Sequence, residues 1–251
     1  MLTTHRKQLL LSRLKQDGKL VAKDLSQEMG VSEDTIRRDL RELAREGLLQ
    51  RVHGGALPSS PAMADFTARE EIRHDGKAAI GRAAAAMIQD GQVVILDGGT
   101  TSREIARHLN RELRATVVTH SPTIALELLQ HPTVEVILIG GRLFKHSVVA
   151  VGAACLEAIG KLRADTFFMG VTGVHPETGL TTGDFEEAGI KRALSHAAAD
   201  TYVLASAEKI SAASPYLVVE WSEVTGIITE SSVSETLLAP YQEMGLSVIR
   251  A

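Results

Sequence analysis

The 251-residue sequence is poor in the residue types that mark several protein classes, with one cysteine, one tryptophan and 4% aromatic side chains. A single cysteine cannot form an intrachain disulfide, so the fold must depend on its apolar core. The low aromatic content argues against an RNA surface built on base stacking. No apolar run approaches the ~20 residues of a membrane span, and no basic-then-apolar leader precedes the first expected helix. These absences predict a cytoplasmic globular protein with no membrane partner.

Signals of metal or covalent catalysis are also missing. The nine histidines show no metal-ligand spacing, and no G-x-S-x-G nucleophile elbow occurs. Cys155 lies in the apolar stretch "VGAACLEAI", which is typical of a buried small hydrophobe. We therefore expect no metal, no cofactor and no catalytic residues.

Charge is distributed unevenly along the chain, although its net value is only -4. Residues 1–57 carry 11 Lys and Arg against 8 Asp and Glu, whereas residues 58–251 carry 16 against 23. A basic head on an acidic body indicates one domain for a polyanion and another for a different ligand. We expect a DNA-binding domain at 1–57, a linker with the start of a connecting helix at 58–75, and an effector-sensing and oligomerisation domain at 76–251.

The head has the pattern of a helix-turn-helix. Residues 4–16 have a helical apolar period, residues 19–21 are short and extended, and residues 22–30 predict a second helix that stops at Gly30. Ser32 is a suitable N-cap for a third helix. A tight turn followed by a capped helix is the arrangement that places a recognition helix in the DNA major groove.

The third helix divides into an apolar and a charged face. Ile36, Leu40 and Leu43 share one side at the spacing of an α-helix. The opposite side and its flanks carry polar residues, namely Asp34, Thr35, Arg37, Arg38, Arg41 and Arg45. Arginine can pair with guanine in the groove, whereas Asp39 and Glu42 are close enough to neutralise some of that charge within the helix.

A hairpin is expected directly after this helix. The segment "LLQRVHGGAL" alternates loosely and contains Gly54-Gly55, which suits a tight turn, so it predicts a wing with Arg51 and His53 facing phosphate or the minor groove. A solvated helix face is the simpler explanation of the arginines alone. The capped turn, the preceding helix and the hairpin together favour double-stranded operator DNA as the partner. The candidate DNA contacts are Ser32, Thr35, Arg37, Arg38, Arg41, Arg51 and His53.

The body alternates between apolar strands and helices. "LPSSPAMADF" (57–66) is typical of an exposed linker, and the following helix is expected to break or weaken near Asp75-Gly76. Strands are expected at Val93–Leu96, Thr116–Thr119, Val134–Ile139, Thr166–Met169, Tyr202–Ala205, Gly226–Thr229 and Leu246–Ile249. Helices are expected at Ser102–Leu109, Thr123–Leu129, Gly152–Ile159, Glu187–Ala199 and Ser234–Met244. This alternation predicts an α/β fold with a mainly parallel sheet.

One strand-to-helix loop has the chemistry of an anion site. In "VVILDGGTTSREIARHL" an apolar strand is followed by Asp97, Gly98, Gly99, Thr100 and Thr101. Glycines let the backbone approach closely, while hydroxyls and the helix N-terminus donate to a phosphate. The lysine of a P-loop is absent, and a plain structural turn with capping hydroxyls is the alternative.

Two further loops are candidates for the same pocket, because ligands bind at the carboxyl ends of parallel strands. "VVTHSPT" contains Thr119 and Ser121, which could equally be a plain helix cap. "ILIGGRLFKHS" contains Gly141, Arg142 and Lys145, whose cations could neutralise a phosphate or face solvent. Three polar loops at one sheet edge favour a shared pocket.

The whole chain resembles the DeoR family of bacterial transcriptional regulators. "VAKDLSQEMGVSEDTIRRDLRELAREGLLQRVHGGA" matches the family's N-terminal signature, and "DGGTT", "VVTHS", "GGRL", "DTFFMGVTGV" and "EEAGIKRA" look like its C-terminal effector domain. The resemblance implies a winged helix-turn-helix followed by a domain similar to ribose-5-phosphate isomerase. It also implies a phosphorylated sugar or related metabolite as effector, and adds Glu187 and Lys209 to the candidate contacts.

The chain departs from the family at one late segment. Where relatives usually carry an Asp-x-Ser-Lys-Phe pattern, this sequence has Ser206-Ala207-Glu208-Lys209-Ile210 and keeps only the lysine. The effector of any relative is therefore an unsafe guide to the effector here.

These observations predict a DNA-binding regulator, a repressor of a sugar or polyol catabolic operon, rather than an enzyme. The alternative is a sugar-phosphate isomerase fused to a DNA-binding head. Related isomerases carry acidic residues after the strand that matches "DTFFMGVTGV", but here that stretch has no carboxylate, and Glu186 and Glu187 are the nearest acids downstream. One head reads only a few base pairs, so a homo-oligomer, dimer or tetramer, is expected.

Overall fold

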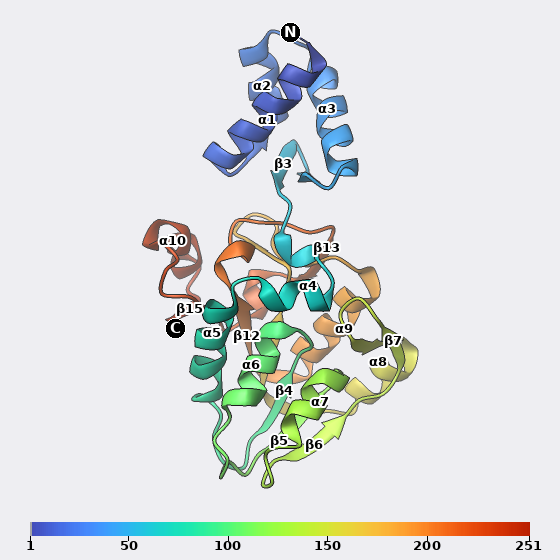
Figure 1. Cartoon of the computed structure of the whole chain (residues 1–251), viewed down its shortest axis with the longest axis vertical. Helices are drawn as coiled ribbons and strands as arrows, with labels where there is room; N and C mark the ends of the chain where they lie inside the picture. The colour runs from blue at the N-terminus through green and yellow to red at the C-terminus, as the bar shows by residue number, and fades with distance from the viewer. Residues whose placement is uncertain (1) are drawn as a thin grey trace.

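A computed structural model describes residues 2–251, and the chain forms a small head joined to a larger body (Figure 1). The head contains helices α1 (Thr3–Asp17), α2 (Ala22–Met29) and α3 (Glu33–Arg45). Strands β1 (Leu20–Val21), β2 (Leu49–Val52) and β3 (Gly55–Pro58) form an antiparallel sheet in the order β1-β3-β2. The head is therefore a winged helix-turn-helix, as predicted.

The apolar face of α3 holds the head together. Ile36, Leu40 and Leu43 are at most 2% exposed and pack against leucines of α1 and α2. Beneath them the guanidinium of Arg6 on α1 pairs with the carboxylate of Asp39, and both side chains are buried. Asp39 is thus used to fix α1 against α3, and the expectation that it would neutralise arginines within its own helix was wrong.

The body is built on one parallel sheet of seven strands, in the order β15-β14-β12-β9-β4-β5-β6. The strands are β4 (Val93–Leu96), β5 (Thr116–Thr119), β6 (Glu135–Leu138), β9 (Ala164–Gly170), β12 (Ala198–Ala205), β14 (Gly226–Thr229) and β15 (Ser247–Arg250). Every neighbouring pair runs parallel. All seven strands predicted from the sequence occur in this sheet, so the predicted parallel α/β fold is confirmed.

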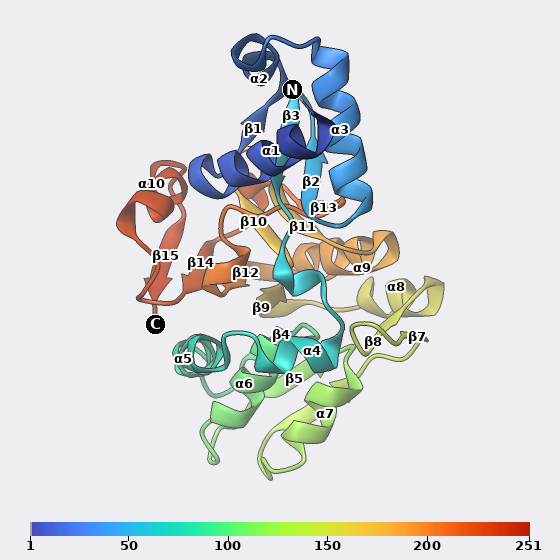
Figure 2. The same ribbon diagram turned by 45° about the horizontal axis from the view of Figure 1, so that its top comes forward.

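Helices cover both faces of the sheet, and each face has its own apolar core (Figure 2). One face carries α5 (His74–Ala85), α6 (Thr100–His108) and α7 (Pro122–Leu128). The other face carries α8 (Ala153–Ile159), α9 (Phe185–His196) and α10 (Glu235–Glu243). The helix expected at Glu187–Ala199 ends earlier than predicted, because α9 ends at His196 and Ala198 already begins β12.

Five short antiparallel strands were not predicted. β7 (Arg142–Phe144) pairs with β8 (Val149–Val151), and β10 (Gly173–His175), β11 (Gly179–Thr182) and β13 (Tyr216–Val219) form a second small sheet. Short 3-10 turns occur at Pro61–Met63 (η1), Ala207–Lys209 (η2) and Trp221–Glu223 (η3). No helix within residues 2–251 has both the length and the apolar character needed to cross a bilayer.

The connection between head and body is packed rather than exposed, which corrects the expectation for 57–66. Ser60, Ala62 and Phe66 are at most 8% exposed, and the Phe66 N–H donates to the His146 carbonyl at 2.9 Å. The next helix also breaks earlier than expected. α4 (Phe66–Glu71) ends before Arg73, whose φ of 53° separates it from α5, and Gly76 lies inside α5.

Candidate functional site

The head exposes the arginines of α3 on the side away from its core. Arg37, Arg38 and Arg41 are solvent-exposed, whereas Thr35 is half-buried. Ser32 caps α3 by accepting the Thr35 N–H at 3.2 Å, and the two hydroxyls lie 2.9 Å apart. The cap fixes where the helix begins and therefore which side chains face outward.

The wing adjoins α3 at Arg37. A cavity of about 160 Å³ between them is lined by Arg37, Arg51 and His53, so three predicted DNA contacts adjoin one groove. Arg37 pairs with Glu33 at 2.7 Å, and Glu42 is held by Lys7 of α1 at 2.9 Å. Neither Arg38 nor Arg41 forms an ion pair with any of residues 2–251. These two guanidiniums are therefore available to a polyanion.

A second site lies at the carboxyl ends of β4, β9 and β12, and we call it the anion pocket. Its lining brings together residues that are far apart in sequence: Ala62, Arg69, Ile72, Lys77, Gly98, Gly99, Thr100, Thr101, Ser102, Gly170, Val171, Thr172, Thr182, Glu187, Lys191, Glu208 and Lys209. The predicted glycine loop forms one wall. The start of α9, η2 and the segment from η1 to α5 form the others.

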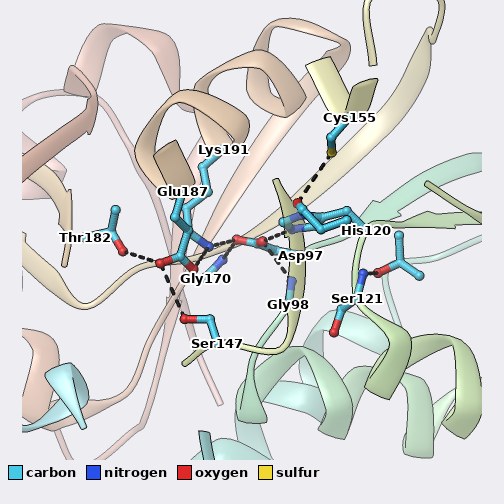
Figure 3. Close-up of polar contacts among 12 residues, drawn as sticks. Asp97, Gly98, His120, Ser121, Ser147, Cys155, Gly170, Thr182, Glu187 and Lys191 are labelled. Atoms are coloured by element: carbon cyan, nitrogen blue, oxygen red, sulfur yellow. Dashed lines mark hydrogen bonds and ion pairs between the residues drawn. The ribbon is translucent and has the colours of Figure 1, made fainter. Parts of the chain in front are cut away.

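A buried charged network supports the floor of the pocket (Figure 3). The Asp97 carboxylate accepts the Gly98 and Gly170 N–H groups, each at 2.8 Å, and the Lys191 ammonium at 2.6 Å. The His120 Nε2 lies 2.9 Å from the same carboxylate, and its Nδ1 lies 2.9 Å from the Ala150 carbonyl. Because both partners of the imidazole are acceptors only, both ring nitrogens must donate, and His120 is an imidazolium.

The titration of this network follows from its geometry. Burial alone would raise the pKa of Asp97, but the charge of Lys191 and the hydrogen bond from His120 lower it to about 2. Burial alone would lower the pKa of His120, but the hydrogen bond to Asp97 raises it to about 9. The network is therefore fully ionised near neutral pH. It holds the backbone of Gly98 and Gly170 in a fixed position at the pocket.

Three other cations in the pocket lack a carboxylate partner. Arg69, Lys77 and Lys209 form no ion pair among residues 2–251, and the Arg69 Nη2 is buried without any hydrogen-bond partner. Burial lowers the pKa of all three groups, that of Lys209 to about 8. A bound anion would reverse that shift, because an opposite charge within about 4–6 Å favours the charged form.

The N-terminus of α6 adds neutral donors to these cations. Gly99 precedes the helix with φ 121°, and no side chain caps the first turn. The N–H groups of that turn lack intrahelical acceptors, and they carry the positive end of the helix dipole. The Ser102 hydroxyl is 1% exposed and has no partner. The arrangement suits an oxyanion such as a phosphate monoester.

Not every predicted effector contact reaches this pocket. Gly98, Gly99, Thr100, Thr101, Glu187 and Lys209 line it, and Asp97 lies directly beneath it. The other five, Thr119, Ser121, Gly141, Arg142 and Lys145, lie outside its lining. Thr119 and Ser121 are buried in turn contacts of their own, and Arg142 pairs with Glu186 at the surface. Gly141, Arg142 and Lys145 lie elsewhere for a topological reason, because β6 is the edge strand and the chain that follows it turns into β7.

Several pocket residues were not foreseen from the sequence. Lys191 lies one helical turn after Glu187 in the quoted "EEAGIKRA" motif, so that spacing could have indicated it. Arg69 and Lys77 gave no local signal, because they belong to the connecting segment and resemble ordinary solvent-facing cations. In the atypical segment 206–210, Glu208 and Lys209 both reach the pocket, and the buried Ser206 hydroxyl donates to Glu208 at 2.6 Å.

Protein-family models match both the head and the body of the chain. The model of the DeoR-like helix-turn-helix domain matches residues 6–61. The model of the DeoR C terminal sensor domain matches residues 72–231, which include every ionisable residue of the anion pocket except Arg69.

Curated relatives align along most of the chain. The HTH-type transcriptional regulator GlpR of Haloferax volcanii is 32% identical over 99% of this chain and 98% of its own length. The HTH-type transcriptional regulator GolR of Listeria innocua is 30% identical over 99% and 98%. The Glycerol-3-phosphate regulon repressor of Escherichia coli is 33% identical over 77% of each chain. All three are named as regulators or repressors and not as enzymes.

Solved structures give only a distant likeness. Ribose 5-phosphate isomerase A from Methanocaldococcus jannaschii aligns with 54% of this chain and 54% of its own at 20% identity, with a TM-score of 0.41.

Proposed function

This chain belongs to the DeoR family of transcriptional regulators, and from that premise we propose that it represses a sugar or polyol catabolic operon and is controlled by a phosphorylated metabolite. Residues 1–57 would bind operator DNA, and residues 76–251 would sense the effector and oligomerise. The observation that carries the proposal is the convergence of Arg69, Lys77 and Lys209 with the uncapped N-terminus of α6 in one pocket.

DNA binding is assigned to α3 and the wing for two reasons. Arg38 and Arg41 are exposed and form no ion pair among residues 2–251. Arg37 lines one cavity together with Arg51 and His53 of the wing. Replacing Arg37 or Arg38 with Ala should weaken operator binding by about 1–3 kcal/mol, since each removes a proposed groove contact. Fluorescence anisotropy with a promoter fragment bound by the wild type would measure this. Arg163→Ala is the matched control, because Arg163 is an exposed arginine of the body that bonds only to its neighbour's carbonyl. Unchanged affinity in a folded double variant would exclude α3 as the recognition helix.

The effector is assigned to the anion pocket because Arg69, Lys77 and Lys209 line it without an ion pair among residues 2–251. A phosphate monoester would satisfy the Arg69 Nη2, the Ser102 hydroxyl and the first-turn N–H groups of α6 at once. By linkage, an effector that lowers operator affinity must itself bind less tightly to the DNA complex. A relative is named a Glycerol-3-phosphate regulon repressor, which supports a phosphorylated polyol or sugar as the class to test.

The proposal is tested by a thermal-shift panel of phosphorylated sugars and polyols, with their unphosphorylated forms as controls. A hit should raise the melting temperature, change affinity for promoter DNA, and be recovered chemically unchanged. Stabilisation by the unphosphorylated forms alone would contradict an anion site, and turnover of the hit would contradict a pure sensor.

Two operator-bound heads require an oligomer, which we propose to be a dimer or tetramer assembled through the body. A single head reads too few base pairs for specific binding, so paired half-sites are needed. Light scattering of the full chain, with and without promoter DNA, measures this directly.

A further inference from the structure

A second cavity adjoins the anion pocket, and we call it the linker chamber. The two share Ala62, Arg69, Thr172 and Glu187 in their linings, but the chamber offers about 240 Å³ whereas the anion pocket offers about 20 Å³. Its remaining lining is Met63, Phe144, His146, Ser147, Gly183 and Asp184. The anion pocket can hold a small charged group, and any larger body attached to that group must enter the chamber.

The walls of the chamber differ in chemistry. The lining includes the Glu187 carboxylate, which is buried and has three long contacts, to the Lys191 ammonium at 3.4 Å, the Ser147 hydroxyl at 3.4 Å and the Thr182 hydroxyl at 3.3 Å. It also includes the apolar groups of Ala62, Met63 and Phe144. A carboxylate with spare acceptor capacity together with apolar groups suits a body that carries both hydroxyls and C–H groups.

Part of the apolar lining belongs to the chain that connects the two halves of the molecule. Ala62 and Met63 form part of η1, which follows the wing strand β3 after two residues, and Figure 1 shows this single strand of chain joining head and body. The segment is docked on the body through the Ala213 N–H, which donates to the Pro58 carbonyl at 3.3 Å, and through the Phe66 N–H. Met63 is therefore close to the wing along the chain, so a displacement of Met63 can move β3.

Met63 also contacts Gly183 directly. A methyl group added to Gly183 would come within 2.8 Å of both the Sδ and the Cε of Met63, so the thioether lies on the glycine backbone. Gly183 precedes Asp184, the N-cap of α9, and α9 carries Glu187 and Lys191 of the anion pocket. An unbranched thioether can change rotamer at low cost, which suits a wall that yields to a ligand.

We infer that the uncharged body of the effector contacts Met63 and that Met63 transmits this binding to the DNA-binding head. This inference rests on the proposed function of the anion pocket. The phosphate gives affinity through the glycine loop and the three cations. The body displaces Met63 from Gly183 and shifts η1, and β3 moves with it. Inorganic phosphate alone then occupies the site without signalling.

The test compares inorganic phosphate with glucose 6-phosphate on the full-length protein, by calorimetry and by amide hydrogen exchange. Phosphate should slow exchange at residues 98–102 only, whereas glucose 6-phosphate should also change exchange at residues 59–64. Met63→Trp should fill the chamber and weaken glucose 6-phosphate about tenfold while leaving phosphate affinity unchanged. Gly183→Ala, which pushes the same thioether from the other wall, should show the same selectivity.

Two further variants separate this inference from the proposed function. Met63→Ala should still bind glucose 6-phosphate but lose the exchange response at 59–64, and Met244→Ala, an exposed methionine next to α10, should behave as wild type. If glucose 6-phosphate protects 98–102 but never 59–64, or if Met63→Trp weakens both probes by the same factor, the role of Met63 is overturned and the anion pocket stands. The proposed function fails, and the role of Met63 fails with it, on a different pair of results. Neither probe protects 98–102, and Thr101→Glu, which places a carboxylate in the anion pocket, still responds to an effector in promoter binding as wild type does.

Discussion

Asp97→Ala should lower the free energy of unfolding by about 3–5 kcal/mol, because it removes a counter-charge from two buried cations, His120 and Lys191. The Asp97 side chain is fully buried, and it is the only carboxylate within 4 Å of His120 among residues 2–251. Lys191 would keep only Glu187, at 3.4 Å. The variant also removes the acceptor of the Gly98 and Gly170 N–H groups, so the glycine loop should loosen.

Urea unfolding followed by far-UV circular dichroism measures this loss. Asp97→Asn keeps the volume and an acceptor oxygen but removes the charge, so it should be destabilised less than Asp97→Ala. Glu243→Ala, which removes an exposed acid at the end of α10, should leave stability within about 0.5 kcal/mol of wild type. A loss below about 1 kcal/mol in Asp97→Ala would show that the network is not ionised as described.

The same network predicts a pH dependence of stability. The pKa of His120 is raised from 6.5 to about 9 in the folded chain, so its contribution is complete below pH 6.5 and is lost as the pH rises through 9. The pKa of Asp97 is lowered from 3.8 to about 2, so its contribution is complete above pH 3.8 and is lost as the pH falls through 2. Lys209 acts in the opposite sense, since its lowered pKa makes folding more favourable as the pH rises above about 8.

The contribution of Lys209 cancels when wild type is compared with His120→Gln, because both proteins contain Lys209. The difference in unfolding free energy between wild type and His120→Gln should be largest near pH 6 and should shrink between pH 6.5 and 9. A difference that stays constant across this range would mean that His120 is neutral in the fold.

The parts of this fold that the sequence predicted are those specified by local patterns. Val93–Leu96 is an unbroken apolar run followed by the turn residues Asp97 and Gly98, and such a run is typical of a strand buried in the middle of a covered sheet. The apolar face of α3 has the helical period, and Gly30 with Ser32 specifies the turn before it. The strand β11 could not be foreseen, because "GLTT" has neither an apolar run nor clear alternation, although all four residues are buried.

The candidate site divides in the same way. Gly98 to Thr101 follow a strand and begin a helix, so their place in the pocket could be predicted from the sequence alone. Arg69 and Lys77 reach the pocket only because the left-handed turn at Arg73 folds α4 back over the sheet edge, which is a tertiary event. Arg142 and Lys145 had the right chemistry, but the edge position of β6 takes them away from it.

Thr101→Glu should abolish the effector response while leaving DNA binding intact, because it places a carboxylate where the anion binds. Thr101 lies in the first turn of α6 at 3% exposure, beside the pocket that also holds Arg69, Lys77 and Lys209. A carboxylate near a helix N-terminus is favourable, and three cations of the pocket form no ion pair among residues 2–251, so the fold should tolerate the change. An added phosphate ester would then meet both a filled space and a like charge.

Promoter binding measured with and without the effector found in the thermal-shift panel decides the outcome. Wild type should show the coupling of about 5–150-fold that is typical of allosteric proteins, and Thr101→Glu should show none. Thr101→Ser is the matched control, because it keeps the hydroxyl and the neutral charge and should respond as wild type. A normal response in Thr101→Glu would remove the glycine loop from the effector site, and with it the reason for the buried cations to converge there.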